Sequence, residues 1–119
     1  MKTVNIYTDG ACRGNPGDGG WGVLIEYENI SKEYFGGEKN TTNNKMELKA
    51  AILGLSVLKE PCAVNITTDS KYVMDGITSW IENWKKNNWK NASKKDVKNK
   101  DLWIELDKLT TKHNVNGIG

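Results

Sequence analysis

Apolar and polar residues alternate along three segments near the start of the chain, and this period of two predicts β-strands. The first strand is predicted over residues 4–8 and ends at Asp9, and the next two cover residues 21–27 and 32–37. The glycine-rich stretch between the first two strands indicates a tight turn. Because both connections are short, we expect the three strands to pair as antiparallel hairpins.

A helical period follows, since apolar residues then recur every three or four positions. This spacing predicts a helix over residues 43–59. Thr42 and Asn44 are both suitable N-cap residues, and Pro61 marks the end of the helix. The two caps differ by two residues in where they start the helix, and the sequence leaves both open.

A fourth strand is predicted over residues 63–68, ending at Asp69, and helices follow it at 70–79, 80–87 and 101–112. This order predicts an α/β fold in which helices flank a mixed sheet. The helix over 43–59 forms a crossover, so strand 63–68 should run parallel to the first strand. Asp9 and Asp69 should then lie at the same sheet edge, where open α/β sheets bind ligands.

Length and composition limit the class of protein. The 119 residues, 37% hydrophobic and 27% charged, predict one globular domain over 1–119. Apolar runs stay far below the ~20 residues that a membrane span needs, so we expect no membrane association. The first residues do not resemble a secretory signal, and Cys12 and Cys62 are too few for a disulfide framework. We therefore expect reduced thiols and a cytoplasmic location.

Positive charge is concentrated late in the chain. The net charge is only +2, yet residues 85–100 contain seven lysines against one acid, Asp96. Trp80, Trp84 and Trp89 lie at or beside this segment. Lysines can contact phosphates and indoles can pack on sugars or bases, which favours binding to a nucleic-acid backbone. The alternative is a solvated lysine-rich loop that its tryptophans anchor to the domain.

Three carboxylates should converge if this topology is correct. Asp9 and Asp69 follow neighbouring strands, and Glu47 lies in the opening turns of the connecting helix. Like charges this close require a cation, and oxygen ligands favour Mg²⁺ or Mn²⁺. Each acid also has a simpler interpretation: Asp9 as a turn residue, Asp69 as a helix cap and Glu47 as a first-turn acid near the helix dipole.

Five motifs together resemble the type 1 ribonuclease H family, bacterial branch, and lie at 7–17, 42–48, 68–70, 80–86 and 97–103. The similarity extends over residues 2–113. It implies the ribonuclease H-like fold, with a five-strand mixed sheet flanked by helices. It also implies an endonuclease that hydrolyses the RNA strand of RNA–DNA hybrids by a two-metal-ion mechanism, with Mg²⁺ or Mn²⁺ as cofactor.

The resemblance implies roles for individual residues. Asp9, Glu47 and Asp69 match the catalytic metal-binding carboxylates. Positions that match contacts to the hybrid's backbone and sugar hydroxyls are Cys12, Asn15, Asn43 and Asn44. Residues 80–100 match a basic protrusion that holds the DNA strand, and the substrate contacts implied in and around it are Trp80, Trp84, Lys85, Lys86 and Trp103. Lys71 departs from the family pattern, in which glutamine can stand at this position, and we expect it to alter a minor-groove contact with the substrate.

The end of the chain departs from the family pattern. The family continues beyond the position of His113 with a fifth strand, a Gly-His loop and a final helix that carries a fourth carboxylate. We therefore expect a truncated last strand, no final helix and weakened activity, with His113 as a plain helix-end residue. An unpaired edge beside strand 63–68 would expose Val64 and Ile66 and allow self-association.

Two other functions remain compatible with the sequence. One is a hybrid-binding module with little catalysis, and the other is an inert truncated product. The three carboxylates favour the enzyme, because a protein that only binds nucleic acid gains nothing from acidic groups that face phosphates. We expect no obligate protein partner.

Overall fold

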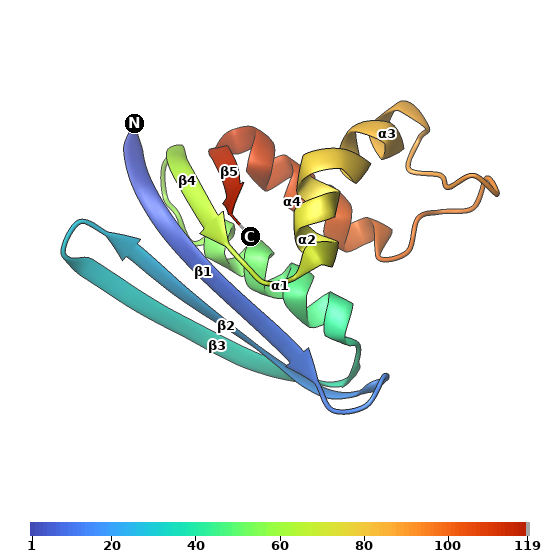
Figure 1. The fold of residues 1–119 in the computed structure, drawn as a ribbon, viewed down its shortest axis with the longest axis horizontal. Helices are drawn as coiled ribbons and strands as arrows, with labels where there is room; N and C mark the ends of the chain where they lie inside the picture. Colours follow the sequence, from blue (N-terminus) through green and yellow to red (C-terminus); the bar gives the residue numbers. More distant parts are fainter. Residues whose placement is uncertain (119) are drawn as a thin grey trace.

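The computed structural model describes residues 1–118 and contains one five-stranded sheet with helices packed against it (Figure 1). The strands follow the spatial order β3-β2-β1-β4-β5, and their bounds are Lys2–Cys12 (β1), Gly17–Tyr27 (β2), Ile30–Thr41 (β3), Cys62–Thr67 (β4) and Asn114–Ile118 (β5). The first three strands pair antiparallel, whereas β4 pairs parallel with β1 and with β5. The predicted α/β mixed sheet is confirmed.

The helical segments are α1 (Asn43–Ser56), α2 (Lys71–Asp75), the π-helical turn η1 (Gly76–Trp80), α3 (Ile81–Lys86) and α4 (Lys100–Lys112). Helix α1 crosses the sheet against β1 and β2, and α4 packs beside α1. Apolar side chains from the sheet and these helices form one buried core, which includes Ile6, Leu48, Leu55, Ile66, Trp103 and Leu106. No helix within residues 1–118 is long and apolar enough to cross a membrane.

Strand β1 is longer than its sequence pattern indicates. Its parallel pairing with β4 ends at Tyr7, but its antiparallel pairing with β2 continues through Asp9 to Cys12. The glycine-rich stretch therefore belongs largely to β2 rather than to a turn, because its residues pair with the second half of β1. The prediction that the first strand ends at Asp9 is therefore wrong, because Asp9 lies inside β1. It lies just beyond the point where the parallel partner stops.

Helix α1 begins at the first of its two suitable caps. The Thr42 hydroxyl accepts a hydrogen bond from the Lys45 backbone N–H at 3.3 Å, which satisfies one of the free donors of the first turn. The helix ends at Ser56 rather than at residue 59. The predicted helices at 70–79 and 80–87 are instead three consecutive pieces, α2, η1 and α3.

Strand β5 changes the expectation for the sheet edge. It pairs with β4 along Ala63–Thr67, and both Val64 and Ile66 are buried. The predicted unpaired edge beside strand 63–68 is therefore wrong. The outer edge of the sheet is therefore β5 rather than β4, and self-association through the sheet edge stays a prediction.

His113 is more than a plain helix-end residue. It is buried between the end of α4 and the start of β4, where its Nδ1 accepts a hydrogen bond from the Cys62 N–H at 3.0 Å. Burial lowers the pKa of His113, and the nearby Lys112 charge lowers it further. The neutral imidazole thus fastens the C-terminal end of α4 to the sheet.

Candidate active site

Asp9, Glu47 and Asp69 form an acidic triad at one corner of the sheet. Each offers a carboxylate oxygen, and these three oxygens lie within 4.8 Å of one another. Asp9 comes from β1, Glu47 from the second turn of α1 and Asp69 from the turn after β4. The two aspartates are exposed and Glu47 is buried. The predicted convergence of the three side chains is present in the structure.

Gly10 brings β1 close enough to α1 for this convergence. A Cβ at this position would lie 2.6 Å from the Met46 carbonyl carbon and 2.7 Å from the Glu47 backbone nitrogen. Any side chain would therefore push the strand away from the helix. The glycine that follows Asp9 sets the separation between the Asp9 and Glu47 carboxylates.

Short polar residues fix the turn that carries Asp69. The Ser70 N–H donates to the Thr68 hydroxyl at 3.0 Å, and the Ser70 hydroxyl caps α2 by accepting from the Val73 N–H at 3.2 Å. Ser70, not Asp69, is the cap of the following helix. The Asp69 carboxylate therefore remains available to the triad, and its simpler interpretation as a helix cap is wrong.

Glu47 is the buried member of the triad, and its environment disfavours a negative charge. Burial is the largest cause that raises its pKa, and Asp69 and Asp9 raise it further, while the Ser70 side chain and the Gly10 backbone offset part of the effect. Among the described residues its Oε1 atom has no hydrogen-bond partner. A buried carboxylate oxygen left without a donor, beside two other carboxylates, fits a hard divalent cation such as Mg²⁺.

The candidate contacts near the triad lie on exposed backbone turns. Asn43 and Asn44 occupy the first turn of α1, four and three residues before Glu47, and both are exposed. Asn15 is exposed in the loop that joins β1 to β2. The Cys12 thiol is half-buried, and its sulfur lies 3.3 and 3.2 Å from the carbonyl oxygens of Gly17 and Thr41, either of which can accept its single S–H. The exposed asparagine side chains can contact a ligand directly. The Cys12 thiol instead contacts backbone carbonyls and so stabilises the loop that joins β1 to β2.

The basic protrusion, residues 80–100, is attached to the domain by aromatic contacts. Trp80 and Trp84 are half-buried with ring centroids 5.7 Å apart, and Trp84 lies 6.2 Å from Trp89. Trp103, on α4, is fully buried at 5.3 Å from Trp84. Trp103 was predicted to contact substrate, and this is wrong because its surface is covered by the other aromatic rings. It anchors the protrusion instead.

Several lysines of the protrusion have acidic neighbours. Lys85 lies 3.6 Å from the Asp107 carboxylate of α4. Lys90 and Lys100 lie 2.7 and 3.5 Å from Asp96, and their positive charges lower the pKa of that carboxyl. The lysines that project into solvent include Lys86 and Lys94. The segment is therefore tied to the domain by aromatic and ionic contacts and positively charged on its outer surface. Its contact with a nucleic-acid backbone stays a prediction.

The tip of the protrusion closes on itself. Trp89 accepts a hydrogen bond from the Val97 N–H at 3.0 Å, and Lys90 pairs with Asp96 as an isolated antiparallel bridge. Inside this bridge the Asn91 side-chain oxygen accepts from two backbone N–H groups, those of Ser93 and Lys95, at 2.9 and 3.1 Å. The loop is thereby stabilised by contacts within itself.

Lys71 lies on α2, two residues after Asp69. Its side chain is 89% exposed and lies 3.8 Å from the Asp75 carboxylate one helical turn away. The side chain has no packing that would fix it in place. The substrate contact of Lys71 stays a prediction, and in this structure its ammonium group lies beside Asp75.

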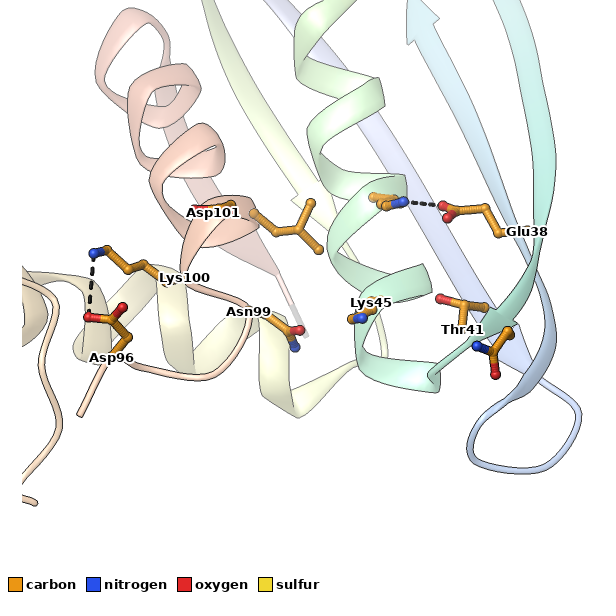
Figure 2. A pocket seen from close by; sticks show the side chains of 10 residues that line it. Glu38, Thr41, Lys45, Asp96, Asn99, Lys100 and Asp101 are labelled. Atoms are coloured by element: carbon orange, nitrogen blue, oxygen red, sulfur yellow. Dashed lines mark hydrogen bonds and ion pairs between the residues drawn. The ribbon is translucent and has the colours of Figure 1, made fainter.

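A hollow of about 550 Å³ lies between the end of β3, the start of α1 and the start of α4 (Figure 2). Figure 2 shows Lys45 on α1 and Asn99 ahead of α4 on opposite sides of this hollow. Lys49 forms an ion pair with Glu38 at its rim. Lys45 and Asn99 were not predicted as a pair, because they come from segments more than 50 residues apart with no shared motif.

Comparison with known proteins gives consistent matches. The family model described as RNase H matches residues 1–118. Ribonuclease H of Alcanivorax borkumensis is 63% identical over 115 residues, which cover 97% of this chain and 76% of that protein. Ribonuclease H of Francisella philomiragia is 63% identical over 114 residues, with 96% and 75% coverage.

Among solved structures, this chain is similar to LC9-RNase H1, described as a type 1 RNase H with the type 2 active-site motif. The TM-score is 0.87 at 31% identity, over 98% of this chain and 62% of that one. The chain thus spans about three quarters of the two sequence relatives and less than two thirds of this structural relative.

Proposed function

Because this chain belongs to the RNase H family, we propose that it is an endonuclease that hydrolyses the RNA strand of RNA–DNA hybrids. The observation that carries the proposal is the convergence of Asp9, Glu47 and Asp69 within 4.8 Å at the sheet edge. The two sequence relatives, both named ribonuclease H, support the same activity. A protein that only bound nucleic acid would gain nothing from three carboxylates facing phosphates.

The acidic triad would hold the divalent ions that this reaction requires, Mg²⁺ or Mn²⁺, in a two-metal-ion site. Bound ions of this kind activate a water nucleophile and stabilise the leaving oxygen. Glu47 supplies the buried oxygen that lacks a donor, and the exposed aspartates leave the site open to solvent and substrate. Gly10 keeps Asp9 at the distance from Glu47 that a shared site needs.

The hybrid would be recognised on both strands. Asn15, Asn43 and Asn44 are exposed, and Asn43 and Asn44 begin the helix that carries Glu47. Amide groups can donate to and accept from the 2′-hydroxyl that distinguishes RNA. On the other strand, the half-buried faces of Trp80 and Trp84 can pack on deoxyribose, and lysines such as Lys86 can contact phosphates. Cys12, Lys71 and Lys85 complete the proposed contact surface.

A fluorogenic RNA–DNA hybrid assay tests this function. The chain should cleave the hybrid in Mg²⁺ or Mn²⁺ and lose activity in a chelator, while duplex DNA of the same sequence should stay intact. A hybrid that is bound but not cleaved with either metal would identify the chain as a binding module. We also propose the cytoplasm as its location, where Cys12 and Cys62 would remain the free thiols seen here.

A further inference from the structure

The hydroxyl of Tyr72 connects two parts of the candidate site that are far apart in sequence. Tyr72 lies on α2, three residues after Asp69. Its oxygen accepts a hydrogen bond from the Trp103 indole N–H and another from the Asn99 side-chain amide, each at 3.1 Å. One oxygen thus links the segment that carries a triad carboxylate to the start of α4.

Trp103 connects the Tyr72 hydroxyl to the protrusion, because it packs against the protrusion's tryptophans. Its ring is fully buried, and the rings of Trp80 and Trp84 lie 6.3 and 5.3 Å from it. The contact with η1 is also tight, because a Cβ on Gly76 would lie 2.0 Å from the indole. The bond from the indole N–H to Tyr72 favours one orientation of this buried ring, and Trp80 and Trp84 pack against the ring in that orientation.

Asn99 lies where the protrusion rejoins the domain. Its backbone has a φ of 59°, in the left-handed region, and the next residue begins α4. Its side chain reaches the hollow opposite Lys45 (Figure 2). The bond from its amide to Tyr72 therefore sets both the direction in which the chain enters α4 and one wall of that hollow.

We propose that Tyr72 is a positioning residue whose hydroxyl holds the basic protrusion in register with the acidic triad. It acts through Trp103 and Asn99, so it contributes to hybrid affinity and not to metal binding or to the chemical step. This inference rests on the proposed function, since it specifies how the same site binds its substrate.

The first test is Tyr72→Phe, which keeps the ring and removes the shared acceptor. Loss of two hydrogen bonds should raise KM for the hybrid about threefold to tenfold. Both kcat and the metal concentration for half-maximal activity should stay within about twofold. Tyr34→Phe is the matched control, because it removes a hydroxyl on β3, and it should leave KM unchanged. A Tyr72→Phe variant with altered kcat or metal requirement, or with unaltered KM, overturns the proposal.

A double-mutant cycle tests the route of this effect. Asn99→Gly accepts the left-handed backbone and removes the amide donor. If Tyr72 acts through Asn99, the double variant Tyr72→Phe/Asn99→Gly should raise KM less than the product of the two single effects. Fully multiplicative effects would mean that the two side chains act separately, and this outcome contradicts the proposal.

A third measurement does not depend on activity. In nuclear magnetic resonance spectra, Tyr72→Phe should shift the Trp103 indole N–H resonance and the backbone amides of residues 80–100, while amides next to Asp9 and Glu47 stay in place. Unmoved protrusion amides overturn the inference. If the unchanged chain fails to cleave hybrids, the proposed function fails instead, and these shifts still report whether Tyr72 positions the protrusion.

Discussion

The acidic triad and the basic protrusion are held in place by different kinds of contact. The triad depends on close approach of backbone, since Gly10 lies against the first turns of α1 with no room for a Cβ. The protrusion depends on side chains: tryptophans that pack at tilted angles, the Tyr72 hydroxyl and partly exposed ion pairs such as Lys85–Asp107. The position of the triad carboxylates therefore follows from backbone packing, whereas the position of the protrusion follows from side-chain contacts that single substitutions can remove.

The largest expected effect breaks the triad itself. Asp9→Asn should reduce hydrolysis about a thousandfold or more, because the loss of a metal-binding carboxylate removes several kcal/mol of transition-state stabilisation. Hybrid affinity should stay the same or rise, since one negative charge near the phosphates is gone. Cleavage rates and binding to the hybrid in chelator measure the two effects separately. Full activity in this variant would exclude Asp9 from the metal site.

The second effect tests the backbone contact. Gly10→Ala should destabilise the fold by about 1–3 kcal/mol, as for overpacked sites, and reduce activity by moving Asp9 away from Glu47. Gly22→Ala is the matched control, because a Cβ there meets nothing within 4 Å although Gly22 pairs with Asp9. Thermal unfolding and cleavage should distinguish the two variants. Equal stability of the two would show that β1 can shift without cost.

The third effect concerns the protrusion. Replacing Lys85, Lys86 and Lys90 by alanine should weaken hybrid binding and reduce the slope of log affinity against log salt by about one unit for each lost phosphate contact. The cleavage rate at saturating hybrid should change little. Alanine at Lys32, Lys39 and Lys59, three exposed lysines outside residues 80–100, is the charge control. An unchanged slope would return the segment to the solvated-loop interpretation.

The smallest expected effect is a loss of stability at low pH. It arises from protonation of His113 at the end of α4, the helix that carries Trp103, and does not involve the triad. The pKa of His113 is lowered in the folded protein, so the unfolded chain binds the proton more readily. Stability should therefore be full above the unfolded value of about 6.5 and fall as the pH drops below it. Thermal unfolding at pH 7.5 and 5 measures this loss. His113→Gln should have a smaller difference between the two pH values, and an equal difference would exclude His113 as the cause.

The sequence predicted the order of the elements, because hydrophobic periodicity is a local signal. It also predicted the convergence of Asp9, Glu47 and Asp69, because acids that follow neighbouring parallel strands lie at the same edge of the sheet. It failed where the outcome depends on a partner segment. Asp9 lies within β1 because the glycines of β2 continue the antiparallel pairing. The burial of Trp103 depends on contacts with Tyr72 of α2 and Trp84 of α3, and the residues around Trp103 in the sequence do not indicate these contacts.

The self-closing tip of the protrusion has a consequence for protein engineering. The loop is closed at its base by the bridge between Lys90 and Asp96 and by the hydrogen bond from the Val97 N–H to the Trp89 carbonyl. The connection between the two sides of the loop therefore does not depend on residues 91–95. Lengthening such a loop is inexpensive, since each doubling costs only about 0.6 kcal/mol of closure entropy. A peptide tag or a reporter segment inserted at this tip should leave the fold intact, which makes it the natural position to attach cargo to the molecule.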